Sequence, residues 1–266
     1  MLQNTAVCMW MLPVDRKGIS MKTSSTQLKA TARGHLSGRY SLLIIAFMIA
    51  RIIINIPSMM ISYTADPYSN TGYFLNFAVT FILSILSAIF VVGHNRICLR
   101  YAGSEEPVTT AEMWYGFKGH ADEIIIAYFL IFIRYFVCAL PFAFALVLCA
   151  MMPNAFSVLF LVAATLFTAI MCIKIELDYS QVFFLIADCV QERPKELLAH
   201  SKQLMEGNRG RLLYIQLSFI GMSLLNLLTF GFAMFWVYPY MRMTYAEFYV
   251  ELKQSLFRET EGSDMQ

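Results

Sequence analysis

Residues 124–173 read IIIAYFLIFIRYFVCALPFAFALVLCAMM-PN-AFSVLFLVAATLFTAIMCI, two apolar runs separated only by Pro153 and Asn154. A helix rises about 1.5 Å per residue, so each run can cross a hydrocarbon core about 30 Å thick. Proline and asparagine favour a turn, and two residues leave room only for a tight hairpin. This stretch therefore predicts a pair of antiparallel transmembrane helices.

Similar apolar runs lie on both sides of this pair. With a window of about 19 residues, the predicted crossings are Ser41–Tyr63, Tyr73–Gly93, Ile124–Met152, Ala155–Ile173, Leu212–Leu228 and Phe232–Tyr249. The composition agrees, because 58% hydrophobic and 14% charged residues cannot give a soluble domain its polar surface. We expect an all-α fold, a polytopic transmembrane helical bundle with about six crossings in three hairpins. The last crossing contains Pro239 and Arg242, so a re-entrant helix is the alternative there.

The positions of the basic residues test these predicted crossings independently, because the crossings were assigned from the apolar runs and not from the distribution of Lys and Arg. Sixteen of the twenty Lys and Arg residues fall in segments that a start on the inner side makes cytoplasmic, and the outer loops hold none. The positive-inside rule therefore predicts that both termini are cytoplasmic, with the basic excess near an anionic leaflet. The remaining four basic residues lie in or beside crossings: Arg51, Arg134, Lys174 and Arg242.

Three short amphipathic segments precede the odd-numbered crossings. They are Thr26–Gly38, Thr109–Gly119 and Pro194–Gly207, and each ends at a glycine. In the third segment, Pro194 is favourable in the first turn of a helix, and Gly207 can adopt the left-handed backbone conformation that ends one. We expect short amphipathic cytoplasmic helices, and the nearly equal spacing suggests three copies of one unit: interfacial helix, crossing, tight return, crossing. The alternative is that any helical hairpin has an amphipathic lead-in.

The chain divides into three regions on this basis. Residues 1–20 are expected to be a disordered extension or the product of a misread upstream start codon, because their charges follow a short apolar stretch. Residues 21–257 form the six-helix membrane domain with its proposed three-fold repeat. Residues 258–266 are expected to be a disordered tail.

The second half of the chain carries a set of short motifs in a specific order. They are Leu177-Asp178-Tyr179-Ser180, Ser201-Lys202-Gln203-Leu204-Met205-Glu206-Gly207-Asn208, Leu217-Ser218-Phe219-Ile220-Gly221, Leu228-Thr229-Phe230-Gly231 and Trp236-Val237-Tyr238-Pro239-Tyr240. In these motifs the sequence resembles the bacterial integral-membrane family catalogued as domain of unknown function nine-seven-five. Met222 departs from the pattern, where the family carries Trp. The resemblance implies a multi-pass protein of the bacterial cytoplasmic membrane and brings no established activity.

Charged residues inside crossings are costly and suggest a functional site. Arg51 and Arg242 lie near the middle of their predicted crossings, and Arg134 either joins them or extends toward the inner surface. They are the candidate binding residues, either for an anion or within a buried polar network. Polar residues that could accept from them form stripes on the second and fifth crossings: Asn76, Thr80, Ser84, Ser87, Gln216 and Ser223.

No sequence motif of an enzyme, a nucleotide site or a metal site is present, so we expect no catalytic residue, no metal and no cofactor. A net charge of +2 is too small to indicate nucleic-acid binding, so we expect no nucleic acid among the partners. The expected partners are the lipid bilayer and either an anionic lipid or another membrane protein. The leading hypothesis is a non-enzymatic structural, regulatory or partner-binding membrane module. The alternative is a transporter or lipid-handling protein with a polar, arginine-lined anion pocket.

Overall fold

The computed structural model describes residues 23–64, 66, 69–103, 108–190 and 192–263, with side chains up to residue 256. Every regular element within these ranges is helical, which confirms the all-α prediction. The elements are α2 (Ser25–Leu36), α3 (Tyr40–Thr64), α4 (Asn70–Gly103), η1 (Thr110–Phe117), α5 (Ala121–Met151), α6 (Ala155–Tyr179), α7 (Val182–Ala187), α8 (Pro194–Leu204), α9 (Arg209–Leu217), α10 (Ile220–Leu228) and α11 (Met234–Ser263). The predicted extension 1–20 lies outside the described residues. The predicted tail 258–266 begins inside α11, which continues to Ser263.

Five helical stretches are long and apolar enough to cross a membrane, and they coincide with the first five predicted crossings. They are Tyr40–Thr64, Asn70–Gly103, Ala121–Met151, Ala155–Ala187 and Arg209–Leu228. The turn between α5 and α6 lies at the predicted Pro153 and Asn154. There the Asn154 side chain accepts from the Ser157 backbone N–H at 2.9 Å and caps α6.

The sixth predicted crossing, Phe232–Tyr249, is helical but is not among these five stretches. It forms the first part of α11, and polar side chains such as Arg242, Thr244 and Glu247 lower its hydropathy. Thr244 and Glu247 are buried, because α11 packs against α2, α3 and α4 rather than facing lipid along its whole length. A turn at Gly231, with φ 94°, still joins α11 to α10 as a third hairpin.

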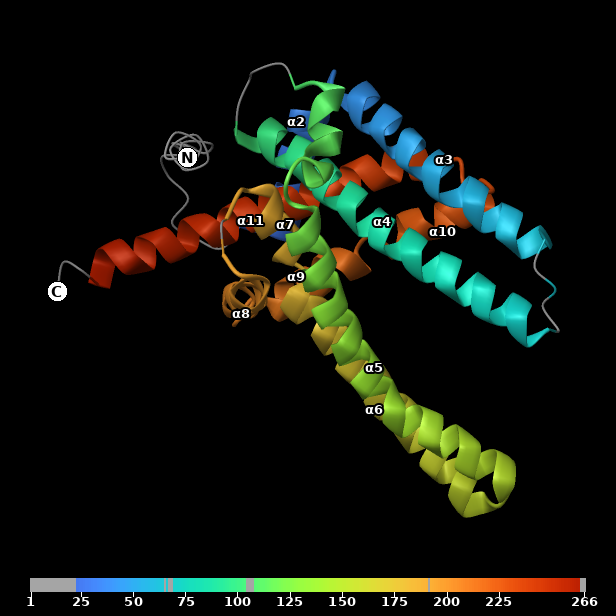
Figure 1. Cartoon of the computed structure of the whole chain (residues 1–266). Helices are drawn as coiled ribbons and strands as arrows, with labels where there is room; N and C mark the ends of the chain where they lie inside the picture. Colours follow the sequence, from blue (N-terminus) through green and yellow to red (C-terminus); the bar gives the residue numbers. More distant parts are fainter. Residues whose placement is uncertain (1–22, 65, 67–68, 104–107, 191, 264–266) are drawn as a thin grey trace.

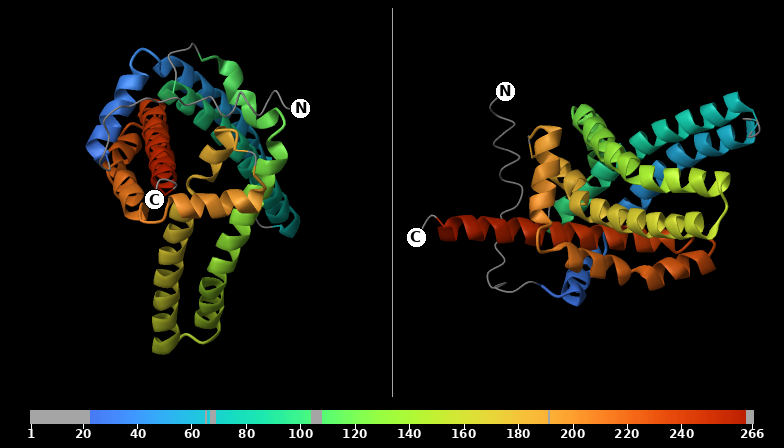
Figure 2. Two further views of the ribbon diagram at one scale, coloured as in Figure 1. Left: turned by 90° about the vertical axis from the view of Figure 1, so that its left-hand side faces the viewer. Right: turned by 90° about the horizontal axis from the view of Figure 1, so that it is seen from below.

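The three hairpins converge at one end of the molecule and diverge at the other. The tips of α3–α4, α5–α6 and α10–α11 lie on one side, while α2, α8 and the C-terminal end of α11 lie on the other (Figures 1 and 2). The protein core sits at the convergent end, where α4 is almost continuously buried from Ala88 to Ala102. The outer parts of α5 and α6 are covered by little other protein, and the side chains of Phe144 and Leu159 are 64% and 68% exposed. Lipid tails would cover such side chains at no cost.

The short helices at the convergent end bury their apolar faces against the bundle. Leu28, Ala32 and Leu36 of α2 are buried, and α2 packs against α11. Lys202 of α8 is exposed, whereas Leu204 is buried. The second predicted amphipathic segment, Thr109–Gly119, differs from the other two because it forms the 3₁₀ helix η1 and not an α-helix.

The glycines that end these three segments all have positive φ angles, as was predicted for Gly207. The φ angles are 75° at Gly38, 96° at Gly119 and 71° at Gly207. A residue with a Cβ would be strained at such angles. A short helix, a glycine with positive φ and a helical hairpin thus follow one another three times along the chain. That the three units are copies of one ancestral unit stays a prediction.

Close packing and buried charge hold the convergent end together. Gly93 of α4 lies so close to η1 that a Cβ there would be 2.1 Å from the Met113 carbonyl oxygen. Asp188, which follows α7 and is 6% exposed, accepts from Tyr249 Oη at 2.9 Å and from Lys253 Nζ. Contacts between elements that are distant in sequence therefore stabilise the convergent end of the molecule.

Candidate functional site: a cavity between the hairpins

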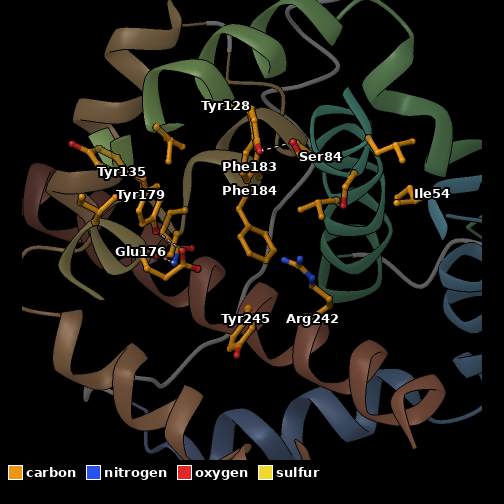
Figure 3. Close-up of a pocket in the computed structure, with 18 of the residues that line it drawn as sticks. Ile54, Ser84, Tyr128, Tyr135, Glu176, Tyr179, Phe183, Phe184, Arg242 and Tyr245 are labelled. Carbon is orange, nitrogen blue, oxygen red and sulfur yellow. Dashed lines mark hydrogen bonds between the residues drawn. The ribbon is translucent and has the colours of Figure 1, made fainter. Parts of the chain in front are cut away.

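A cavity of about 580 Å³ lies where the three hairpins meet (Figure 3). Its wall is built from α3, α4, α5, α6, α7, α9 and α11, so no single hairpin encloses it. Much of the wall is apolar, with Ile54, Leu83, Ile131 and Phe183 among its residues. This volume is in the range of pockets that hold a small organic ligand.

A polar stripe of α4 forms one side of the cavity. Thr80, Ser84 and Ser87 line it, as helical spacings of four and three residues predict for one face. Tyr128 of α5 donates from its hydroxyl to Ser84 Oγ at 2.8 Å, which links two hairpins across the cavity. Gln216, the polar residue predicted on the fifth crossing, also lines it.

Arg242 supplies the positive charge of the cavity. Its guanidinium is directed into the space from α11 (Figure 3). Arg242 Nε donates to Tyr238 Oη at 3.2 Å, one helical turn earlier, and the guanidinium carbon lies 5.3 Å from the centroid of the same ring. Within the part of the chain that the structure describes, no carboxylate forms an ion pair with Arg242. A guanidinium has five N–H donors, so most of its binding capacity is available to a ligand.

The other two predicted arginines lie outside the cavity. Arg51 of α3 is exposed, with its guanidinium carbon 5.8 Å from the Phe47 ring centroid. Arg134 of α5 is also exposed, and its Nη1 donates to the Leu130 carbonyl oxygen at 2.9 Å. It stacks over Tyr179, a residue of the cavity wall, at 4.8 Å. The structure therefore does not bring the three arginines together, and only Arg242 lines the cavity.

Several polar residues of the cavity were not identified from the sequence, and Glu176 and Gln181 are the most informative of them. Glu176 of α6 lines it and accepts from Tyr135 Oη at 2.9 Å. Gln181, between α6 and α7, lines it as well and is 1% exposed. The sequence signal for both was weak, because they lie near the end of the fourth crossing, where charged and polar residues are ordinary. Only the arrangement of the neighbouring helices makes them part of this site.

The cavity wall combines a small set of polar groups with apolar side chains. The described residues that line the cavity include neither histidine nor cysteine. Elsewhere in the described ranges, no group of three or more His, Cys, Asp or Glu side chains is placed to hold a metal ion. What the site offers is one guanidinium, one carboxylate, several hydroxyl groups and apolar walls.

Five helical stretches that are long and apolar enough to cross a membrane indicate a helical membrane protein. The chain belongs to the family described as protein of unknown function (DUF975), whose model matches residues 21–255. This match confirms the resemblance seen in the short motifs and extends it to the first half of the chain. Neither the curated proteins nor the solved structures include a significant match.

Proposed function

We propose that this protein binds the anionic group of a membrane amphiphile in its central cavity, as a lipid-handling or transport protein. One observation carries the proposal: the Arg242 guanidinium is directed into a cavity of about 580 Å³ with a single tyrosine hydroxyl as its described hydrogen-bond partner. The sequence alone favoured a structural or partner-binding module with a closed bundle. A cavity at the arginine favours the alternative.

The positive charge of Arg242 supports the binding of an anionic group of the ligand. A cation surrounded by low-dielectric protein and lipid is costly unless an anion or several acceptors lie next to it. A phosphate or carboxylate can accept two parallel N–H bonds from a guanidinium, and such charge-assisted pairs are stronger than neutral hydrogen bonds. The apolar side chains of Leu83, Ile131 and Phe183 suit the hydrocarbon part of the same molecule. We propose binding without catalysis.

The binding proposal can be tested with lipids that differ only in the phosphate. Dioleoyl phospholipids should raise the melting temperature of the detergent-solubilised protein, and diolein, which has the same chains without phosphate, should not. Arg242→Gln should lower phospholipid affinity about tenfold or more, because it removes a charge-assisted contact. Arg242→Lys should lose most of this affinity too, because lysine keeps the charge but not the planar fork.

Arg51→Gln is the matched control, since Arg51 is also an arginine within a crossing but lies outside the cavity. It should bind phospholipid as the wild type does. If Arg242→Gln and wild type were stabilised equally by phospholipid, Arg242 would be a packing residue and the proposal would fail.

We further propose that the protein lies in the bacterial cytoplasmic membrane with both termini cytoplasmic. The distribution of basic residues supports this orientation, because helices at the convergent end such as α2 and α8 carry several of them, whereas the turns at the hairpin tips carry none. Thr23, the first described residue, is also held there: its N–H donates to Glu251 Oε1 at 2.9 Å, and its carbonyl oxygen accepts from Arg211 Nη2 at 2.8 Å. Contacts between the beginning and the end of the described chain support termini on one side.

Reporter fusions give the expected result for this orientation. Alkaline phosphatase fused after Asp66, Asn154 or Gly231, at the three hairpin tips, should be active, because the enzyme folds only outside the cytoplasm. The same enzyme fused to the C-terminus should be inactive, and green fluorescent protein there should fluoresce. An active phosphatase at the C-terminus would contradict the proposed orientation.

A further inference from the structure

The cavity contains two opposite charges that are not paired with each other. Arg242 reaches it from α11 and Glu176 reaches it from α6, and the two side chains stand apart in Figure 3. The described partner of Glu176 is the Tyr135 hydroxyl at 2.9 Å, and that of Arg242 is the Tyr238 hydroxyl at 3.2 Å. A ligand with a single negative charge would satisfy Arg242 and be repelled by Glu176. A ligand with both charges would satisfy both side chains.

A buried acceptor without a partner points to a ligand donor. Gln181 lines the same cavity and is 1% exposed. Its amide nitrogen donates to Ser180 Oγ at 2.9 Å, whereas its Oε1 has no hydrogen-bond partner among the described residues. Buried polar atoms are nearly always hydrogen-bonded, so an orphaned amide oxygen in a cavity wall indicates a missing N–H or O–H group. The oxygen itself has almost no accessible surface, so the Gln181 amide has to turn toward the cavity before a water or a ligand headgroup can supply this group.

We propose that the occupant of the cavity is a zwitterionic aminophospholipid, with its phosphate on Arg242 and its primary ammonium at Glu176 and Gln181 Oε1. This inference rests on the proposed function and names the class of ligand. A primary ammonium carries three N–H donors, which matches a carboxylate and an orphaned amide oxygen. A trimethylammonium group has no donor and would leave that oxygen unpaired.

The surroundings of the cavity favour a lipid over a free headgroup. Beyond the cavity, the hairpins α3–α4 and α5–α6 diverge (Figure 1). Many apolar side chains of α5 and α6 are exposed there. Acyl chains can leave between these hairpins into the bilayer while the headgroup stays at the charged residues. Apolar wall residues such as Ile54 and Ile131 fit this path. A soluble zwitterion would leave them without a partner.

Four dioleoyl lipids, matched in their chains, test the inference on the detergent-solubilised full chain. Phosphatidylethanolamine should bind at least tenfold tighter than phosphatidylglycerol, phosphatidylcholine or diolein, as measured by native mass spectrometry and by the rise in melting temperature. Glu176→Gln should reduce the preference for phosphatidylethanolamine over phosphatidylglycerol at least fivefold. Glu176 is exposed to the cavity and accepts one hydrogen bond, so this variant should fold.

Lys174→Gln is the matched control on the same helix, because Lys174 is exposed and does not line the cavity. Its lipid preference should equal that of the wild type. An unchanged preference in Glu176→Gln would overturn the aminophospholipid inference while leaving the proposed function intact, provided that Arg242→Gln still loses phospholipid. Equal binding of phosphatidylcholine would also overturn it, as would equal competition by soluble glycerophosphoethanolamine. Loss of any Arg242 dependence would instead refute the proposed function.

Discussion

Replacement of Gly93 by alanine is expected to lower the melting temperature of the protein by about 5–10 °C. A Cβ at this position would meet the Met113 carbonyl oxygen at 2.1 Å and the carbonyl carbon at 2.7 Å. Both are backbone atoms, so α4 and η1 would have to move apart, and overpacking of this kind costs about 1–3 kcal/mol or more. For a chain of this size, about 1 kcal/mol corresponds to a few degrees. Heating in detergent followed by size-exclusion chromatography measures the change.

Gly210→Ala is the control for this variant. Gly210 lies in α9, is exposed, and would have no atom within 4 Å of an added Cβ. Alanine is favoured over glycine in a helix by about 1 kcal/mol, so this variant should be as stable as the wild type or slightly more stable. If Gly93→Ala melted at the wild-type temperature, α4 and η1 would not be in close contact in the folded protein.

Asp188→Ala is expected to destabilise the protein by about 2–4 kcal/mol. The carboxylate side chain is 3% exposed and holds both Tyr249 Oη and Lys253 Nζ of α11. Its removal leaves the buried tyrosine hydroxyl without this acceptor and an ammonium without its counter-ion, and the loss of one member of such a network is costly. The Lys253 side chain is 30% exposed, so water replaces part of the lost interaction. Thermal unfolding in detergent reports the change.

Asp188→Asn separates charge from hydrogen bonding. The amide oxygen can still accept from Tyr249, so this variant should lose less stability than Asp188→Ala. Asp122→Ala is the surface control: Asp122 is exposed in the first turn of α5, where a carboxylate contributes at most about 1 kcal/mol. Equal melting temperatures for Asp188→Ala and Asp122→Ala would show that the Asp188 network does not hold α11 to α7.

The five apolar stretches and the glycine stops could be predicted from the sequence because both are local properties. The length and hydropathy of a run decide whether it can span a bilayer, and Gly38, Gly119 and Gly207 mark backbones that need positive φ. The sixth crossing was harder, because local hydropathy does not tell whether Thr244 and Glu247 face lipid or other helices. Their burial depends on the path of α11 through the bundle.

The composition of the cavity wall was harder to predict than the sixth crossing, because it depends on how several helices pack together. Arg51 and Arg242 have nearly the same predicted depth, yet one is exposed on α3 and the other lines the cavity. The more polar neighbours of Arg242, such as Thr244 and Glu247, distinguish the two positions in sequence but do not predict that Arg242 lines a cavity. Glu176 and Gln181 join the site only because α6 turns into α7 beside α11. The polar face of α4 was predicted, because a single helix determines it.

The divergence of the three hairpins has a mechanical consequence. Protein contacts fix only their convergent ends, and the outer halves of α5 and α6 are covered by little protein. Surrounding lipid, rather than other protein segments, is therefore expected to cover the apolar side chains on the outer halves of α5 and α6. A change in bilayer thickness is then expected to change the spread of the hairpins, and with it the shape of the cavity that Arg242 and Glu176 line.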